Sequence, residues 1–296
     1  MKILVTGATG FIGRHLVKCL VNTNEIHIIV RKESRIPFET EKINIFYYDW
    51  SIEKLITYFK QEKFDGVVHL ASLFLVTHST DEIARLIGSN VQFATELLEA
   101  SKISGVKWFI NTGTFWQNYQ NEEYNPANLY AATKEAFVVI AKYYTQTSDL
   151  IFTTIKLNDT FGPNDTRNKV FNLWAKIAES GELLEMSAGE QIIDISYIDD
   201  VISAYKLLIE HLNSKNAQEF KNSVFGVSSN ERIPLRELAI LYEEATATKL
   251  NIEWGARSYR EREVMTPWDK GKTVPGWKQK YSLKEAIIKT VQKELK

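Results

Sequence analysis

A tyrosine and a lysine four residues apart, Tyr130 and Lys134, form the pair in this sequence best suited to proton transfer. On a helix, residues at this spacing share one face, so the ammonium can lie close to the phenol. A nearby ammonium lowers the pKa of a phenol from its usual value of about 10. The phenol could then protonate a carbonyl oxygen that is being reduced, or accept a proton from an alcohol that is being oxidised. Alone the spacing is weak, because a surface lysine near a half-buried tyrosine is a common alternative.

A glycine-rich segment at residues 6–13, TGATGFIG, offers a place for a phosphate-bearing cofactor. It follows an apolar run at 3–5 and opens a stretch with helical apolar spacing at 11–21. The three glycines permit a tight turn and a close backbone approach to a pyrophosphate, while the helix start supplies free N–H groups. The alternative is an ordinary glycine turn between a strand and a helix. The loop residues expected to bind the cofactor are Gly7, Thr9, Gly10, Phe11, Ile12 and Gly13.

Two cations end the second apolar run, Arg31 and Lys32. A dinucleotide site usually carries Asp or Glu here, which binds the ribose 2′-hydroxyl of NAD. A guanidinium can instead hold a 2′-phosphate through two hydrogen bonds, and Arg14 could add a third cation. The sequence therefore predicts NADP(H) as the cofactor, with a solvated pair of charges at a strand end as the alternative.

Alternating short apolar runs and amphipathic stretches position these residues. The runs are continuous, which is typical of strands covered on both faces, and the alternation predicts an α/β fold with a doubly wound parallel sheet. We expect strands at 3–5, 26–30, 43–48, 66–70, 108–111 and 152–157, and helices at 11–21, 55–60, 83–101 and 130–145.

The pattern changes after about residue 163. Helices are expected at 172–180, 199–211 and 234–247 and strands at 192–196 and 224–227, while the last fifty residues look irregular. We expect a Rossmann domain at 1–165, with returning segments at about 189–228. A smaller, discontinuous substrate lobe would comprise 166–188 and 229–296.

Composition excludes several classes of protein. The 296 residues carry a formal net charge of −1, with no basic stripe for nucleic acid. No apolar stretch approaches the ~20 residues needed to span a membrane, and no signal peptide is recognised. The single cysteine, Cys19, fits a reducing cytoplasm. The expected partner is a small molecule and no metal is expected.

The glycine spacing Gly-x-x-Gly-x-x-Gly, followed by Thr112 at a strand end and by Tyr130 and Lys134, resembles the extended short-chain dehydrogenases/reductases over nearly the whole chain. The resemblance implies that Tyr130 is the acid or base, that Lys134 orients the nicotinamide ribose, and that Thr112 hydrogen-bonds the substrate oxygen. Thr114 is a second candidate for that bond, and hydroxyls that cap a turn are the alternative. Members of this family often dimerise, here through helices 83–101 and 130–145.

The same resemblance extends the cofactor site. Asp49 stands where the family contacts the adenine, and 70–72 would line the nicotinamide ribose. The further residues expected at the cofactor are Trp50, Leu70, Ala71, Ser72, Asn90 and Leu157.

Segments 111–117, 159–169, 189–191, 197–201 and 260–263 are similar to a narrower group, the CDP-abequose and CDP-paratose synthases, which are nucleotide-sugar 4-keto reductases. Asp159 stands where related epimerases have Asn. A nucleoside diphosphate needs cations, which the second half supplies, although a solvated charge is the alternative for each arginine. The expected substrate residues are Thr114, Phe115, Trp116, Asp159, Arg167, Lys169, Tyr197, Arg260 and Arg262.

The resemblance thus implies NADPH-dependent reduction of the C4 ketone of a CDP-linked deoxyhexose for a surface polysaccharide such as O-antigen. The alternatives are a 4-epimerase that retains NAD, a reductase of GDP- or dTDP-linked sugars, and a non-enzymatic NADP-sensing protein. A 4,6-dehydratase is disfavoured, because Gly113 and Thr114 replace the Asp and Glu that carry protons in that group.

Overall fold

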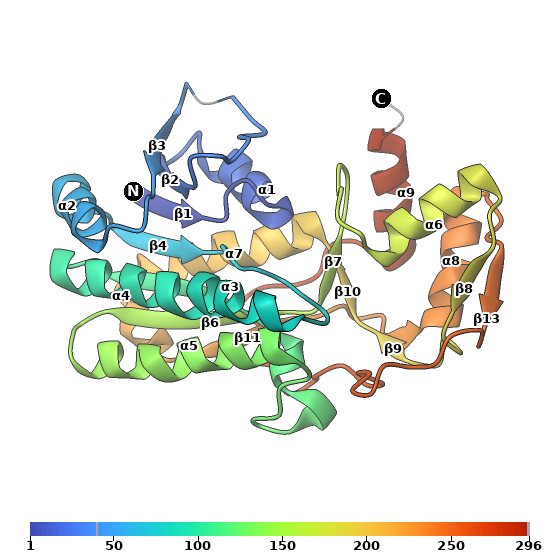
Figure 1. The fold of residues 1–296 in the computed structure, drawn as a ribbon. Helices are drawn as coiled ribbons and strands as arrows, with labels where there is room; N and C mark the ends of the chain where they lie inside the picture. Colours follow the sequence, from blue (N-terminus) through green and yellow to red (C-terminus); the bar gives the residue numbers. More distant parts are fainter. Residues whose placement is uncertain (40, 295–296) are drawn as a thin grey trace.

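A parallel sheet of seven strands forms the centre of the computed structural model, which describes residues 1–39 and 41–294 (Figure 1). The order is β11-β6-β5-β4-β1-β2-β3, so the direction of winding reverses between β1 and β4. Ligands of such sheets bind beyond the carboxyl ends of the strands at this reversal. The strands are β1 (Lys2–Thr6), β2 (Glu25–Val30), β3 (Ile43–Tyr47), β4 (Gly66–His69), β5 (Trp108–Thr114), β6 (Ile151–Leu157) and β11 (Val224–Val227).

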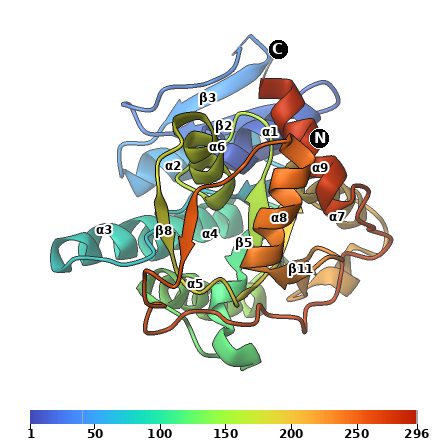
Figure 2. The ribbon, with the colours of Figure 1, turned by 90° about the vertical axis from the view of Figure 1, so that its right-hand side faces the viewer.

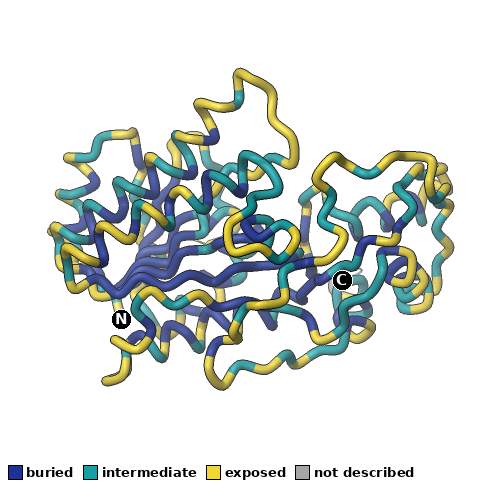
Figure 3. The backbone as a smooth tube through the Cα atoms, turned by 90° about the horizontal axis from the view of Figure 1, so that it is seen from below, coloured by how far each residue is buried: buried dark blue, intermediate teal, exposed yellow. Residues whose placement is uncertain are grey.

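Helices cover both faces of this sheet, as the continuous apolar strands predicted. One buried cluster joins the sheet to α1 (Phe11–Leu20) and α7 (Ile198–Leu212). A second joins it to α2 (Ile52–Glu62), α4 (Phe93–Ser104) and α5 (Leu129–Gln146). Figure 3 shows the strands as a buried layer between these more exposed helices. The doubly wound α/β fold is therefore confirmed.

The expected long helix at 83–101 is interrupted. A 3₁₀ turn, η1 (Thr80–Glu82), leads into α3 (Ile83–Ile87), and a π-helical turn over Gly88–Gln92 separates α3 from α4. Such turns insert an extra residue and often occur at functional sites. This one carries the fully buried Asn90, whose amide bonds the chain after β4.

A second lobe lies beyond the carboxyl ends of the strands (Figures 1 and 2). The short strands β7 (Asp159–Phe161) and β10 (Ile195–Tyr197) pair in parallel at the start of this lobe. The expected strand at 192–196 is wrong as one element, because Asp194 turns inward to pair with Arg232. The lobe contains α6 (Val170–Ser180), α8 (Leu235–Thr246) and α9 (Leu283–Glu294), with strands β8 (Leu184–Met186), β9 (Ile192–Ile193), β12 (Ile233–Pro234) and β13 (Ile252–Trp254).

The last fifty residues are also more regular than expected, because α9 buries Leu283, Ala286 and Ile287 in the core. Three further 3₁₀ turns connect the elements: η3 (Phe115–Gln117), η4 (Tyr119–Asn121) and η5 (Ala217–Phe220). Among the described residues, no helix is long and apolar enough to cross a membrane.

Candidate active site

The glycine-rich loop joins β1 to α1 at the carboxyl edge of the sheet. Gly7 has a φ of +69°, and a Cβ there would lie 2.5 Å from the backbone nitrogen of Ala71. A Cβ on Gly13 would lie 2.1 Å from the carbonyl oxygen of Gly7. Gly10 precedes α1, and no side chain caps the helix. The uncapped first turn leaves N–H groups for an anion, so the loop fits a dinucleotide pyrophosphate.

The cationic side chains at the end of β2 have no partner among the described residues. Arg31 and Lys32 are exposed, and neither side chain has a hydrogen bond or ion pair with any residue that the structure describes. Arg14 differs, because its guanidinium donates to the carbonyl of Asn164 and lies 5.5 Å from the centre of the Phe11 ring. Two free cations, rather than three, are therefore available at the β2 end.

The adenine end of the expected cofactor site lies beside β3. Asp49 accepts a hydrogen bond from Lys54 and another, of 3.3 Å, from the Ser51 N–H. Trp50 has a φ of +67° and is 51% exposed, with its ring edge toward Phe93. The exposed indole is free to meet a ligand, but the roles of Asp49 and Trp50 stay predictions.

The β4 end is held close to the glycine loop. The N–H of Leu70 donates to the Thr6 carbonyl at 3.2 Å, and that of Ala71 donates to Thr6 Oγ1 at 3.2 Å. Leu157 ends β6 and is buried, with Thr114 opposite it on β5. These contacts fix the wall of the crevice on which the cofactor is expected.

Lys134 lies one turn after Tyr130 on α5, whose start is capped by Asn128. Its side chain is 2% exposed, and within the described part of the chain its ammonium makes no hydrogen bond or ion pair. Burial lowers the pKa of Lys134 to about 8. A buried cation without a partner is costly, which indicates that a ligand completes this site.

The phenol of Tyr130 is held in its protonated form. Burial raises the pKa of Tyr130 to about 12, and a hydrogen bond with Ser72 offsets the rise only in part. The expectation that the pKa of Tyr130 is lowered is therefore wrong, because loss of water around the phenolate is the largest influence on this group and Lys134 is not among the causes of the shift. A protonated phenol suits a proton donor.

Asn90 holds this end of α5 in place. Its Oδ1 accepts from Ser72 Oγ at 3.1 Å and from the Leu73 N–H at 2.7 Å. Its Nδ2 donates to the Leu73 carbonyl at 3.0 Å and to Thr133 Oγ1 at 3.0 Å. The amide is thus fully used within the chain, so Asn90 positions the cofactor crevice rather than presenting a free group to it.

Thr112 and Thr114 differ in what they can reach. The side chain of Thr114 is buried and its Oγ1 accepts from the Trp116 N–H at 3.3 Å, which caps η3. Thr112 is partly exposed, and its Oγ1 lies 2.7 Å from the hydroxyl of Tyr205 on α7. Of the two residues, Thr112 is the one that keeps part of its surface exposed.

A cavity of about 280 Å³ lies between the carboxyl edge and the second lobe. Within it Lys169 Nζ pairs with Asp159 at 2.8 Å, and Arg260 pairs with Glu263 at 2.7 Å. Asp159, which stands where related epimerases have Asn, therefore has Lys169 as its partner. Other expected substrate residues on the cavity wall are Phe115 and Trp116.

Besides the buried Thr114, three expected substrate residues do not line this cavity. Arg167 donates to Asp165 at 2.7 Å and to the carbonyl of Thr160, which closes the turn after β7. Tyr197 is 3% exposed and packs against other rings in the core. Arg262 lines a neighbouring cavity, over the ring of Tyr119. The sequence alone could not distinguish these three residues from those on the cavity wall, because the direction of each side chain depends on the tertiary structure.

Two residues at the site were not predicted. Phe74 lies edge-on to the Tyr130 ring at 5.0 Å between centroids, contacts Trp116 and carries Lys169 over its face at 4.8 Å. Tyr205 is fully buried beside Thr112. Phe74 follows the β4 segment and could have been suspected from its position, but nothing in the sequence links Tyr205 with Thr112.

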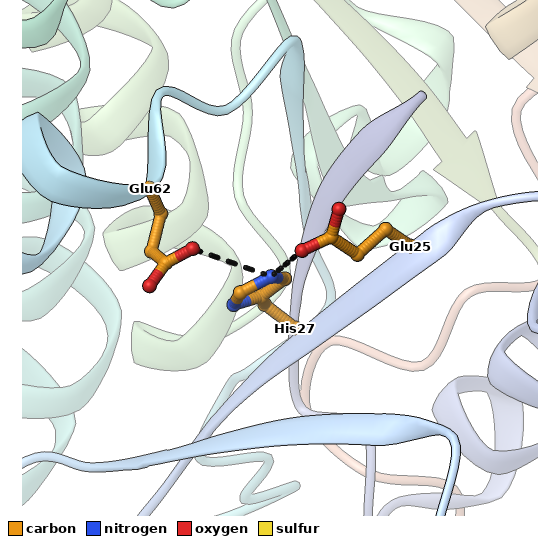
Figure 4. A group of neighbouring side chains, drawn as sticks. All are labelled: Glu25, His27 and Glu62. Atoms are coloured by element: carbon orange, nitrogen blue, oxygen red, sulfur yellow. Dashed lines mark hydrogen bonds and ion pairs between the residues drawn. The ribbon is translucent and has the colours of Figure 1, made fainter.

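A cluster at the opposite edge of the sheet has the composition of a metal site but contains its own cation. Glu25, His27 and Glu62 bring three ligand atoms within 4.8 Å of one another (Figure 4). Lys2 Nζ lies 3.0 Å from Glu25 and 2.9 Å from Glu62, and therefore pairs with both carboxylates. His27 Nδ1 is 2.6 Å from the Tyr58 hydroxyl. Because these side chains bond one another, we interpret the cluster as structural.

Known proteins share this architecture. The chain is 27% identical to a CDP-abequose synthase of Salmonella muenchen over 97% of its own length and 96% of the relative's. It is 26% identical to that of Yersinia pseudotuberculosis, covering 99% and 100%. Among solved structures, a UDP-glucose 4-epimerase of Thermotoga maritima with UDP-glucose has a TM-score of 0.81 at 25% identity, with 99% and 98% covered. A UDP-glucose 4-epimerase of Thermus thermophilus with NAD has a TM-score of 0.82 at 22% identity, with 100% and 99% covered.

The family model described as "NAD dependent epimerase/dehydratase family" matches residues 3–222, which include the glycine loop, Thr112, Tyr130 and Lys134. A nicotinamide dinucleotide is the cofactor that this match supports, in keeping with the uncapped glycine loop. With its fold, its loop and its tyrosine–lysine pair in place, the chain belongs to the NAD-dependent epimerase/dehydratase family.

Proposed function

We propose that this protein reduces the C4 ketone of a CDP-linked deoxyhexose with NADPH, as a step toward a surface-polysaccharide sugar. The observation that carries the proposal is the Tyr130 phenol, which burial keeps protonated with a pKa of about 12, one helical turn before the buried Lys134 on α5. A reductase needs a proton donor at this point. The full-length similarity to CDP-abequose synthases supports the choice of sugar and nucleotide.

Thr112, Tyr130 and Lys134 each have a separate role in the proposed reaction. Thr112 donates a hydrogen bond to the ketone oxygen, and Tyr130 transfers its proton to that oxygen as negative charge develops. Lys134 would hold the ribose hydroxyls beside the nicotinamide, and the ribose would supply the partner that its buried ammonium lacks among the described residues. When bound, the nicotinamide supplies the hydride that reaches the ketone carbon.

Cofactor choice rests on the end of β2. The side chains of Arg31 and Lys32 have no partner among the described residues, so both are available for a 2′-phosphate. An NAD site would place a carboxylate there, which would repel that phosphate. These two cations support NADP(H) over NAD(H).

The sugar nucleotide is expected in the cavity between the sheet and the second lobe. Lys169 and Arg260 supply positive charge, while Phe74, Phe115 and Trp116 form an apolar wall beside Tyr130. A deoxygenated sugar face packs on such a wall without burying an unpaired hydroxyl. The wall therefore supports a deoxyhexose.

A 4-epimerase is the second candidate, since solved neighbours at TM-scores of 0.81 and 0.82 are UDP-glucose 4-epimerases. Such an enzyme would return the hydride and retain its NAD through purification. A reductase would need added NADPH and would consume one equivalent for each ketone reduced.

The test is a side-by-side assay of CDP-, GDP-, UDP- and dTDP-linked 4-keto sugars with NADPH and with NADH. We expect the CDP-linked substrate and NADPH to give the highest kcat/KM. Preference for a GDP- or dTDP-linked sugar would remove the CDP assignment and leave the chemistry standing. Turnover without added cofactor, by protein that carries NAD, would establish the epimerase. Absence of turnover with every sugar would favour a non-enzymatic NADP-binding role.

A further inference from the structure

Tyr205 on α7 contacts Thr112 from the face of the sheet opposite α5. Its side chain is fully buried, and its hydroxyl lies 2.7 Å from Thr112 Oγ1 across a sequence separation of 93 residues. Burial raises the pKa of Tyr205, and the nearby Tyr130 raises it further, so this phenol keeps its proton. A neutral phenol is thus fixed against the partly exposed Thr112.

The direction of this hydrogen bond follows from the burial of the two hydroxyls. A phenol carries one proton, and Thr112 is the one hydrogen-bond partner of the Tyr205 hydroxyl found among the described residues. If Thr112 were the donor, the Tyr205 proton would be buried without an acceptor, which is costly. If Tyr205 is the donor, the proton of Thr112 remains free, on a residue that is partly exposed.

We infer that Tyr205 is a positioning residue that donates to Thr112 Oγ1 and so directs the Thr112 proton toward the substrate's ketone oxygen. The inference rests on the proposed function, in which Thr112 binds that oxygen. A threonine hydroxyl without this partner would rotate freely among its staggered positions. With it, one lone pair of Thr112 is occupied, and the proton is held ready before the ketone arrives.

The test is a double-mutant cycle between Tyr205→Phe and Thr112→Val, which each remove one hydroxyl and keep the volume of the side chain. We expect Thr112→Val to lower kcat about a hundredfold and Tyr205→Phe to lower it about three- to tenfold, with the KM for NADPH unchanged. If Tyr205 acts through Thr112, the double variant should have the kcat of Thr112→Val within about twofold.

The matched control is Tyr58→Phe, which removes the hydroxyl of a half-buried tyrosine that is bonded to His27 at the opposite edge of the sheet. It should leave kcat unchanged, and its effect should add to that of Thr112→Val. Circular dichroism and Tm establish that each variant is folded. Tyr205→Leu is a second hydroxyl-free variant if Tyr205→Phe does not fold.

Multiplicative losses in the double variant, or a wild-type kcat in Tyr205→Phe, would overturn the inference while the reductase proposal stands. A wild-type chain that epimerises instead permits the same cycle on the epimerisation rate, with the same two outcomes. A wild-type chain that turns over no sugar removes the proposed function first and the inference with it. The two failures are therefore distinguishable.

Discussion

The two edges of the central sheet differ in whether their charged side chains have partners within the chain. At the amino edge, Lys2 bonds Glu25 and Glu62, and His27 bonds Glu25 and Tyr58, so each of these charged groups has a partner. Figure 4 shows His27 between the two glutamates. At the carboxyl edge, Lys134 is buried without one among the described residues. The charged groups at the amino edge thus have partners within the chain, whereas Lys134 at the other edge has none among the described residues.

This difference indicates which edge serves stability and which serves function. Interactions made within the chain contribute to folding, whereas an unpartnered buried group lowers stability until a ligand supplies its partner. Residues of functional sites commonly lower the stability of the folded chain, because they are suited to the ligand rather than to folding. Variants of matched residues at the two edges should therefore have opposite effects on activity and stability.

The largest contrast is expected between two half-buried tyrosines, Tyr130 and Tyr58. Tyr130→Phe should lower kcat by about 10²–10⁴ with little change in cofactor affinity, because it removes the proton donor. Tyr58→Phe should instead lower Tm and leave kcat unchanged. Steady-state kinetics and thermal unfolding of both variants measure the contrast. Near wild-type kcat in Tyr130→Phe would show that another group delivers the proton.

Two lysines should differ in the sign of their effect on stability. A pKa of about 8 for Lys134 in the fold, against its ordinary 10.5, corresponds to about 3 kcal/mol of destabilisation at pH 7. Lys134→Met should therefore stabilise the cofactor-free chain by up to about that amount, while turnover and NADPH binding are lost. Lys2→Met should destabilise it by at most about 1 kcal/mol, because Lys2 is partly exposed.

The pH dependence gives an independent check on Lys134. Below about pH 8 the folded chain must hold a charged ammonium away from water, and this penalty declines as the pH rises from about 8 toward 10.5. The stability difference between Lys134→Met and the wild type, measured by urea unfolding, should therefore shrink over that range. A difference that does not vary with pH would mean that Lys134 is not desolvated as the structure has it.

Cofactor preference should be the next largest effect. Arg31→Ser should lower kcat/KM for NADPH by about tenfold or more, through the loss of charge-assisted bonds to the 2′-phosphate, and leave the value for NADH unchanged. Arg35→Ser removes another exposed cation from the same segment and serves as the control. Equal use of NADH and NADPH by the wild type would remove the main argument for a reductase over an epimerase.

Local spacing was enough to predict much of this site. The glycine loop, the strand ends and the Tyr130–Lys134 pair each lie within one strand–turn–helix unit, so the period of the apolar residues fixes their place. The π-helical turn at Asn90 was not predictable, because it depends on bonds to Leu73 and Thr133 from other elements. The contact between Thr112 and Tyr205 is of the same kind, since it requires α7 to pack across the sheet.

Electrostatics was the least predictable feature. The sequence places an ammonium one turn from the Tyr130 phenol, and this pair alone predicts a lowered pKa. In the fold, burial acts on both groups, so that the pKa of Tyr130 rises and that of Lys134 falls. Only the tertiary structure determines how much water each group loses, and this loss outweighs the effect of one neighbouring charge.

The smallest effect is expected from two ion pairs, one at each edge of the sheet. Asp159 pairs with Lys169 beside the cavity at 2.8 Å, and Asp65 pairs with Lys107 at the amino edge at 2.7 Å. Asp159→Asn should raise the KM for the sugar nucleotide by about two- to fivefold without improving kcat, because Lys169 loses the partner that holds it over Phe74. Asp65→Asn should lower Tm slightly and leave KM unchanged. Calorimetric titration with free CDP separates two explanations of the first result: unchanged affinity would place Asp159 at the sugar or the loop. Tighter binding of CDP to Asp159→Asn would instead mean that this carboxylate repels the diphosphate, and that the carboxyl edge is better matched to its ligand without it.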